Sequence, residues 1–582
     1  MISKIKSVLP LLNRKLSNGI KRFPEAIGFA AATVGLLIVI NHRQAPEETI
    51  KLLTRMAMVL ALGFPITLSL RVFWEHHIKQ RGKFVITIFP LTLAALIIYL
   101  SFALKELSPI AVSRYLAYSL ACYLAFLFIP YLTNHKDFEL YVLDLFTKFC
   151  ATYLYAATLY LGLLAILFTI DQLFGVQIND KLYLDFWLII AGLLAPIYFL
   201  AEIPKHSRTY EPEHYPNVLK VLFVYILIPL FSVYTIILYA YFAKIISTQT
   251  WPIGLVGHLV LWYAAFSAVV IFCLYPIRKQ NWLAEKFLTL FPWLILPLIG
   301  MMFVAMGKRI ETFGITENRY YVLIAGLWVT GWMLYYCFGK HPRNVLLPFS
   351  LAIIAVLAVT GPWSSFTVAK NSQRQRLLTL LDKYELLEDN TIIPRPNLSA
   401  KAKGEICSII AYFHDNHSMK EIRILPHDFT TNDMEDVFGF KFTRRSALGK
   451  DGREFYAYQS TEEDRLLSLD GYAVFADLTG IYKEKTLCQK GLYDITYSGQ
   501  EKMLVIAEDG RELYRKNMAD LLKNVLKAED PASESAQIPI ITDQNEQLIV
   551  RYLFKQVHGW KDPYSKEFEV DWAEFYLFIG ER

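Results

Sequence analysis

The sequence predicts a membrane-spanning bundle of about eleven α-helices followed by a soluble α+β domain. Three observations lead to this fold class. The 582-residue chain is 54% hydrophobic, with a mean hydropathy of +0.32. Long apolar segments fill residues 1–362, whereas strand-like alternation is common in residues 363–582. The first part carries 30 basic and 17 acidic residues and the second part 29 and 36, so the net charge changes from positive to negative.

Eleven apolar segments approach or exceed the length that crosses a bilayer, about 20 residues for a helix. Nearly all are free of charge in their middle, and they lack the polar face of a soluble amphipathic helix. A soluble protein would have to bury all eleven in one core. The predicted spans are 24–40, 56–73, 84–104, 115–132, 149–170, 184–201, 218–243, 256–276, 287–306, 320–338 and 345–361.

The distribution of Lys and Arg predicts the orientation. If the N-terminus is cytoplasmic, the cytoplasmic segments hold about twice as many basic residues as the opposite loops, as the positive-inside rule requires. An odd number of spans then places the C-terminal domain outside the cytoplasm. The positive charge therefore needs no nucleic acid to explain it. The bilayer is the partner we expect, and we expect no nucleic-acid partner.

Two prolines within one span, Pro292 and Pro297, are the best candidates for a broken helix of the kind that transporters use. The alternative is that a membrane helix tolerates them. Ionisable residues inside the spans are few. Arg71 and Asp185 lie near span ends, where their side chains can reach the membrane interface.

Three motifs resemble a known family. RIETFGITENRY occupies 309–320, GPWSSF occupies 361–366, and RFP occupies 22–24 at the mouth of the first span. Together they resemble the bacterial membrane-protein family catalogued as domain of unknown function 4153, over about residues 20–380. The resemblance implies a multi-pass protein of the bacterial cytoplasmic (inner) membrane and no established activity.

The first of these motifs contains the only charged cluster that we single out as a site. Gly314 permits a tight turn, and Thr316 is a suitable N-cap for the helix that follows. Arg309, Glu317 and Arg319 would gather at the bilayer edge and could contact an anion or a lipid head group. The alternative is a capped helix start with interfacial ion pairs.

Residues 363–397 are expected to form a connecting helix and linker, and residues 398–582 a soluble α+β domain, for which an extracytoplasmic location is expected. Helical spacing of apolar residues predicts helices at 371–387, 399–414 and 513–527. Alternation and turn signals such as Asp509-Gly510 predict strands at 420–425, 454–459, 468–477, 493–498, 502–507, 547–556 and 567–579.

The soluble domain contains no nucleophile elbow, P-loop, dinucleotide-binding or zinc-protease motif, so no cofactor and no metal site are expected. His414 and His417 lie together at a predicted helix end, which is more typical of a solvated terminus than of a metal site. Cys407 and Cys488 could form a disulfide if the domain is extracytoplasmic. In the cytoplasm they would be thiols.

Three functions remain open from the sequence. The first is transport, or the handling of a lipid or another envelope component, across the cytoplasmic membrane. The second is envelope signalling or assembly, in which the outer domain binds a small molecule or an envelope protein. The third is a membrane-embedded transferase that uses His258 with Arg309, Glu317 and Arg319. Because no catalytic motif is present, an enzyme is not the first expectation.

Overall fold

The computed structural model divides the chain into two compact units, which we call the helical unit (1–251 and 255–372) and the C-terminal unit (252–254 and 373–582). The division falls within the segment expected to connect the two domains. The structure describes residues 16–43, 45–77, 81–132, 136–175, 178–204, 210, 215–248, 255–339, 341–388, 391–442, 454–459, 471–478, 485–488, 493–528, 540–561 and 567–582.

In the described part of the helical unit, nine stretches of helix are long and apolar enough to cross a membrane. Some contain more than one element, because short π-helical or 3₁₀ segments interrupt the α-helix. The nine stretches are Pro24–His42 (α2), Glu47–Glu75 (in α3, Glu47–His77), Pro109–Tyr131 (α5, Pro109–Phe128, with η2, Ile129–Tyr131), Phe138–Phe174 (α6), Lys181–Glu202 (α7, Lys181–Ile189, η3, Ile190–Leu194, and α8, Ala195–Glu202), Asn217–Thr248 (α9, Asn217–Lys220, η5, Val221–Leu227, and α10, Ile228–Thr248), Gly257–Ile277 (α11, Leu255–Leu274, and η6, Tyr275–Ile277), Trp282–Phe313 (α12) and Glu317–Phe338 (α13).

Two shorter apolar helices correspond to the remaining predicted spans. One covers Phe89–Ala103, formed by the end of α4 (Arg81–Ile98) and the π-helical η1 (Tyr99–Ala103), and the other is α14 (Leu346–Leu357). Each of the eleven apolar segments therefore coincides with a helix. The prediction of a helical membrane region followed by an α+β domain is confirmed, and the protein is a multi-pass membrane protein.

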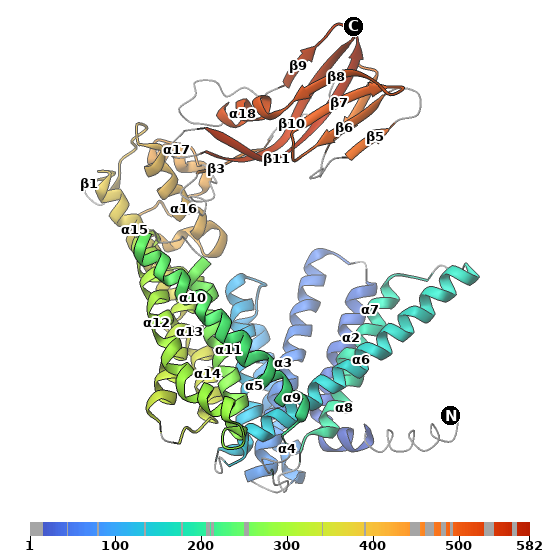
Figure 1. Ribbon diagram of the computed structural model, residues 1–582, viewed down its shortest axis with the longest axis vertical. Helices are drawn as coiled ribbons and strands as arrows, with labels where there is room; N and C mark the ends of the chain where they lie inside the picture. Colours follow the sequence, from blue (N-terminus) through green and yellow to red (C-terminus); the bar gives the residue numbers. More distant parts are fainter. Residues whose placement is uncertain are drawn as a thin grey trace. The chain divides into compact units, whose positions relative to one another are not determined.

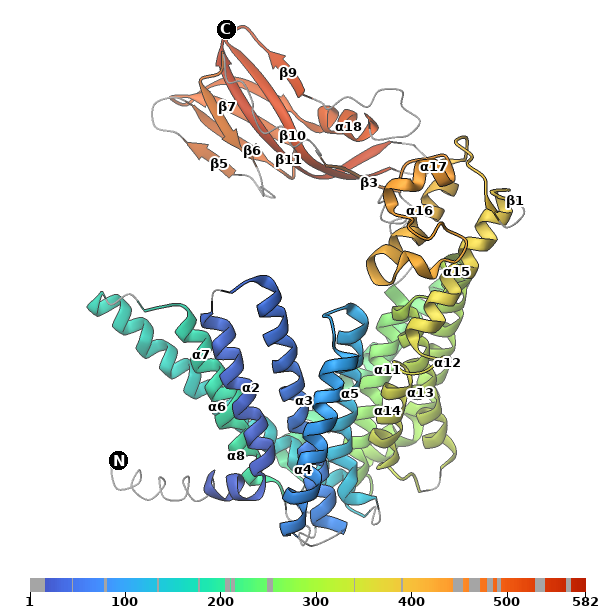
Figure 2. The same cartoon turned by 180° about the vertical axis from the view of Figure 1, so that it is seen from behind.

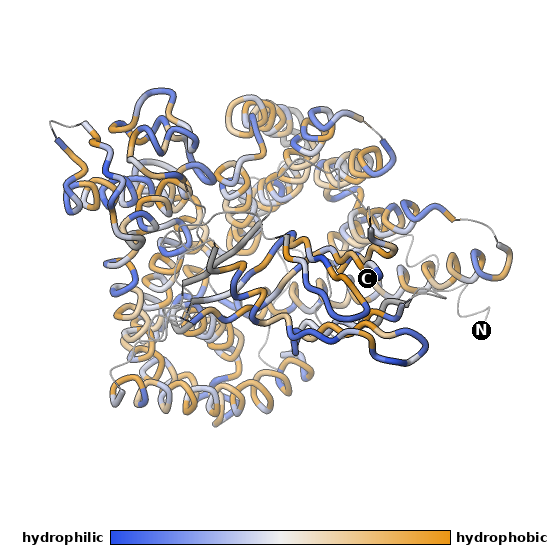
Figure 3. The backbone as a smooth tube through the Cα atoms, turned by 90° about the horizontal axis from the view of Figure 1, so that it is seen from above, coloured by the Kyte–Doolittle hydropathy of each residue, from blue (hydrophilic) through white to orange (hydrophobic). Residues whose placement is uncertain are grey.

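The helices pack with their sequence neighbours and with some distant ones. Helix α2 packs on α3, α3 contacts both α4 and α5, and α5 packs on α14 (Figures 1 and 2). Helices α11, α12 and α13 form a second contacting group. Fully buried side chains such as Val260 and Met302 lie in the main core, whereas Trp262 is 72% exposed. Orange, hydrophobic residues follow the helices in Figure 3. An apolar outer surface is the one that lipid tails accept.

Helix α12 continues through both Pro292 and Pro297 as a single α-helix. Both prolines lie within a helix that packs on α10, α11 and α13, and this packing accommodates the lost backbone hydrogen bonds. The structure thus shows no interruption there, and a hinge role for the two prolines stays a prediction.

The C-terminal unit begins with a helical part. Helix α15 (Ser365–Lys383) leads into it and is followed by a small hairpin of β1 (Leu387–Glu388) and β2 (Thr391–Ile392), then by α16 (Ala400–Asn416) and α17 (Met434–Phe438). Two 3₁₀ turns, Met419–Glu421 and Thr431–Asp433, lie between these helices. Ile406, Ile410 and Phe413 on one face of α16 belong to one buried core with Leu377 and Leu381 of α15. The predicted helix at 399–414 is confirmed.

Two antiparallel sheets follow. The first has the order β3-β10-β11-β4, with β9 also paired to β10, and the second has the order β5-β6-β7-β8. Their buried side chains and those of α18 (Ala519–Ala528) form one core, which includes Tyr552 and Phe575. The strands are β3 (Glu454–Gln459), β4 (Val474–Asp477), β5 (Lys485–Cys488), β6 (Asp494–Ser498), β7 (Met503–Glu508), β8 (Arg511–Asn517), β9 (Ile540–Gln544), β10 (Leu548–Lys561) and β11 (Phe568–Glu581).

Some predicted elements of this unit are wrong. Residues 420–425 form no strand but a 3₁₀ turn and loop, because their apolar residues Ile422 and Leu425 fill the helical core. The predicted helix at 513–527 begins instead as strand β8, and α18 starts only at Ala519. The turn at Asp509-Gly510 is confirmed, since both residues have positive φ between β7 and β8.

Candidate functional site, an apolar pocket in the helical unit

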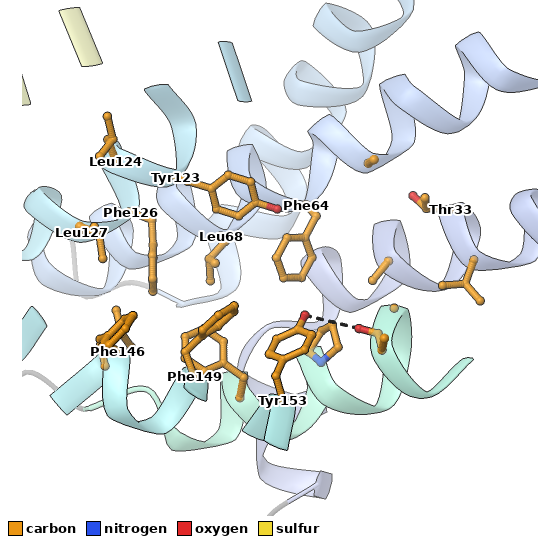
Figure 4. A pocket seen from close by; sticks show the side chains of 18 of the residues that line it. Thr33, Phe64, Leu68, Tyr123, Leu124, Phe126, Leu127, Phe146, Phe149 and Tyr153 are labelled. Atoms are coloured by element: carbon orange, nitrogen blue, oxygen red, sulfur yellow. Dashed lines mark hydrogen bonds between the residues drawn. The ribbon is translucent and has the colours of Figure 1, made fainter. Parts of the chain in front are cut away.

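A pocket of about 590 Å³ lies among helices α2, α3, α5, α6 and the α7–α8 segment. We call it the apolar pocket and define it by its lining. The lining residues are Ala30, Thr33, Val34, Leu37, Ala61, Phe64, Leu68, Tyr123, Leu124, Phe126, Leu127, Val142, Leu145, Phe146, Phe149, Tyr153, Leu188, Ala191, Gly192, Pro196 and Phe199. In Figure 4, Phe146, Phe149 and Tyr153 of α6 lie across the space from Phe64, Leu68 and Tyr123.

The backbone of the α7–α8 segment shapes one wall of the apolar pocket. Its residues Ile190–Leu194 form a π-helical turn, a rare feature that occurs often at functional sites. Gly192 in this turn lies so close to α2 that a Cβ atom there would be 2.7 Å from Cγ2 of Val34. The absence of a side chain at Gly192 therefore sets how closely the two helices approach at the wall.

The polar atoms of the lining are few, and two are already satisfied within the protein. The Thr33 hydroxyl donates to the Phe29 carbonyl at 2.8 Å, and the Tyr153 hydroxyl donates to the Ala191 carbonyl at 3.4 Å (Figure 4). The rest of the lining is apolar apart from the Tyr123 hydroxyl. Such a site recognises a ligand by shape and by the removal of apolar surface from water, not by charge.

Near one end of the pocket, charged residues of α3 pair with Glu25 of α2 and with Arg22, which precedes α2. Arg71 contacts Glu25 at 3.4 Å, and Arg22 contacts Glu75 at 3.0 Å. Arg22 also donates to the Ile203 carbonyl at 2.7 Å, which ties the end of α8 to the same group. The Arg71 side chain, which the sequence placed near a span end, is only 8% exposed. Glu25, 46 residues away in the sequence, provides the partner.

Near the opposite end, His42, Asn41 and Asp185 form a second polar group, which we call the His42 cluster. Asp185 accepts from the Asn41 amide at 2.9 Å and contacts Nε2 of His42 at 2.5 Å. Asn41 also donates to the Lys181 carbonyl at 2.9 Å. This group was missed in the sequence, where 143 residues separate His42 from Asp185 and no local pattern joins them.

The predicted site at the end of α12 has the local geometry of a helix boundary. Gly314 has φ +69°, as a tight turn requires, and α13 begins directly after Thr316, although the Thr316 side chain makes no capping hydrogen bond. Arg319 donates to the carbonyls of Phe313 and Gly314 at 3.1 and 2.6 Å. These bonds satisfy the carbonyl of the last residue of α12 and that of the C-cap residue after it. Contact of Arg309, Glu317 and Arg319 with an anion stays a prediction.

The remaining predicted residues lie on α11, α16 and β5. His258 lies on α11, next to Gly257. A Cβ atom added at Gly257 would be 3.1 Å from the methyl carbon of Met306. Met306 precedes Arg309 by about one turn of α12. Cys407 is buried in α16. Cys488 ends strand β5, and its side chain lies outside the described residues, so the disulfide stays a prediction. Within the described ranges, no three His, Cys, Asp or Glu side chains gather as a metal site.

Comparisons with known proteins agree with the resemblance seen in the motifs. An uncharacterized protein of Pasteurella multocida (strain Pm70) is 21% identical over 389 residues, which cover 66% of this chain and 63% of that protein. The chain therefore matches somewhat less than two thirds of the relative's length. No solved structure matches significantly. The family profile described as "Domain of unknown function (DUF4153)" matches residues 28–392, more than half of the chain. This protein therefore belongs to the DUF4153 family.

Proposed function

We propose that the helical unit binds a lipid-like molecule in the apolar pocket and handles or transports it across a bacterial cytoplasmic membrane. The observation that carries this proposal is the pocket of about 590 Å³ with an almost wholly apolar lining. Small-molecule sites in proteins range from about 300 to 1,000 Å³ and are predominantly apolar. Because all its walls belong to membrane-spanning helices, lipid-like compounds are the solutes with direct access to it.

The local backbone supports movement as well as binding. The π-helical turn at Ile190–Leu194 leaves an irregular hydrogen-bond pattern in a wall of the pocket. The described part of the chain has two further π-helical segments, η1 and η5. π-helical turns are rare and occur frequently at functional sites. A handling or transport cycle needs walls that rearrange, and we infer that this irregular wall is the part that does so. We place the N-terminus in the cytoplasm and the C-terminal unit outside it, following the Lys and Arg distribution.

The test uses the full chain in lipid nanodiscs and an alkyl probe that carries a diazirine. We expect photolabelling of the α6 peptide containing Phe146, Phe149 and Tyr153. Replacing Thr33 by Phe fills the pocket with a ring, and labelling of that peptide should fall about tenfold, which corresponds to about 1.4 kcal/mol of binding free energy. Thr33 suits this purpose because its hydroxyl bonds only within its own helix.

Ala32→Phe is the matched control. Ala32 is the neighbour of Thr33 on α2, is exposed, and does not line the pocket. This variant adds the same ring to the same helix on another face, so labelling should be unchanged. If both variants are labelled as strongly as the unmodified protein, the probe reacts with the outer surface of α6 and not from within the pocket. The proposed function is then wrong.

A further inference from the structure

The apolar pocket and the His42 cluster are consecutive along the same two helices. Leu37 of α2 and Leu188 of α7 line the pocket, and α2 packs on α7. Asn41 follows Leu37 by four residues, and Asp185 precedes Leu188 by three. At 1.5 Å per residue, these steps are about 6 and 4.5 Å along the helix axes. The polar cluster therefore begins about one helical turn beyond the apolar lining.

Within the cluster, both oxygens of Asp185 and the amide nitrogen of Asn41 are engaged, whereas His42 uses one of its two ring nitrogens. Each oxygen of Asp185 has a partner, Asn41 for one and His42 for the other, and the Asp185 side chain is 11% exposed. The His42 ring is 42% exposed and uses only Nε2 in this contact. Its Nδ1 atom can therefore meet a group that comes from outside the cluster.

At the other end of the pocket, the charged side chains that the structure describes are already paired with one another. Arg71 and Glu25 are 8% and 6% exposed, and Arg22 and Glu75 are 14% and 12% exposed. These four side chains neutralise one another. An incoming head group would have to break buried ion pairs, which is unfavourable because each charge would lose its partner away from water. A molecule with an apolar tail and a polar head would thus place its head at His42.

We propose that His42 binds a head-group oxygen of an amphiphile whose alkyl chain occupies the apolar pocket. Asp185 and Asn41 are positioning residues, because Asp185 fixes the ring and Asn41 fixes Asp185. A neutral ring with Nε2–H turned to Asp185 accepts at Nδ1 from a hydroxyl, and a protonated ring donates there to a phosphate. The shared chemistry is a hydrogen bond to a head-group oxygen. This inference rests on the proposed function and specifies the ligand class of the same site.

The test compares three photoreactive probes with the same diazirine-bearing chain, presented to the full chain in nanodiscs. One is a hydrocarbon without a head, one is a diacylglycerol, and one is a phosphatidic acid. For His42→Ala and Asp185→Asn, we expect labelling of the α6 peptide by the hydrocarbon to stay within about twofold, which also shows that the pocket is intact. Labelling by at least one head-bearing probe should fall about five- to tenfold, as expected for one lost hydrogen bond.

Asp180→Asn is the control, since Asp180 is exposed, precedes α7 and makes no side-chain capping bond. It should leave all three probes unchanged. If the His42→Ala and Asp185→Asn variants lose labelling only by the diacylglycerol, Nδ1 of His42 binds a hydroxyl. If they lose labelling only by phosphatidic acid, it binds a phosphate. If the variants label normally with both head-bearing probes, the head-group assignment is overturned while the pocket stands. If the hydrocarbon fails to label the unmodified protein, the proposed function and this inference fall together.

Discussion

Arg71 of α3 and Glu25 of α2 form an ion pair inside the helical unit, with 3.4 Å between Nη1 and Oε1. Both side chains are more than nine-tenths buried, so neither charge has water as a substitute partner. Removal of one partner of a buried ion pair costs about 3–5 kcal/mol in proteins. The contact of Arg71 with Glu75, at 3.8 Å, offsets part of that cost here. We therefore expect Glu25→Gln to lower the thermal unfolding temperature clearly in detergent, as measured by tryptophan fluorescence.

The exposed pair of Glu47 and Lys51 on α3 is the control for that experiment. The two groups are 2.9 Å apart but largely in water, with the Glu47 side chain 81% exposed. Exposed pairs contribute little, because solvent screens them and holding two long side chains costs entropy. Glu47→Gln should leave the unfolding temperature unchanged. If Glu25→Gln and Glu47→Gln lowered the unfolding temperature equally, burial would not be what makes the Arg71–Glu25 pair important for stability.

Contact between α2 and α3 depends on Gly63. A Cβ atom at Gly63 would lie 2.5 Å from Cδ1 of Phe29, a distance that forces the two helices or the ring to move. We expect Gly63→Ala to destabilise the helical unit by about 1–3 kcal/mol, as overpacked cores do. The measurement is the unfolding midpoint in a denaturant titration of the solubilised protein.

Gly35→Ala on α2 tests whether this loss comes from packing. A Cβ atom at Gly35 meets nothing within 4 Å. Alanine also favours a helix over glycine by up to about 1 kcal/mol. This variant should therefore match or exceed the stability of the unmodified protein. A loss similar to that of Gly63→Ala would show that α2 and α3 are not packed as described.

Acid should weaken the sheets of the C-terminal unit through Asp543. Burial opposes its ionisation, but hydrogen bonds from Lys516 and Tyr514, at 2.8 and 2.7 Å, outweigh that effect and hold the pKa of Asp543 below its ordinary value of 3.8. A carboxyl with a lowered pKa in the folded state stabilises the fold above its ordinary pKa. That contribution is lost as the pH falls through the lowered value.

We expect the protection of β8 and β9 amides in hydrogen exchange, corrected for the intrinsic rate, to fall below about pH 4, where unfolded carboxyls begin to take up protons. Asp543→Asn should already show reduced protection at pH 7 and a weaker dependence on pH. Protection that falls equally in both proteins on acidification would assign the effect to other carboxyls.

The orientation is testable with a protease-cleavable tag at the C-terminus in intact spheroplasts. The Lys and Arg distribution predicts cleavage without lysis, because an odd number of spans places the C-terminal unit outside. A tag that is cut only after lysis would reverse the orientation. If the tag is cleaved without lysis, the disulfide becomes testable as well. A mass difference of two hydrogens between the unreduced and the reduced protein would support a bridge between Cys407 and Cys488.

The sequence alone specified the positions of the membrane helices. The predicted spans 149–170 and 287–306 are long and apolar enough to cross a bilayer, where the backbone must satisfy its own hydrogen bonds. They lie within the observed helices Phe138–Phe174 and Trp282–Phe313. The helix at Ala400–Asn416 and the hairpin turn at Asp509-Gly510 were also predictable, because their signals are local. The prediction of a strand at 420–425 was wrong, because a short apolar run does not by itself distinguish a strand from other buried structure.

Tertiary structure alone decided which helices meet and what they enclose. The apolar pocket needs side chains from five regions of the chain, and leucines that face it are indistinguishable in sequence from those that face lipid. Glu25 reaches Arg71 across 46 residues, and His42 reaches Asp185 across 143. The length and composition of a segment determine that it crosses the membrane. Its partners depend on shape, through close approaches such as Gly192 against Val34, and no single segment carries that information.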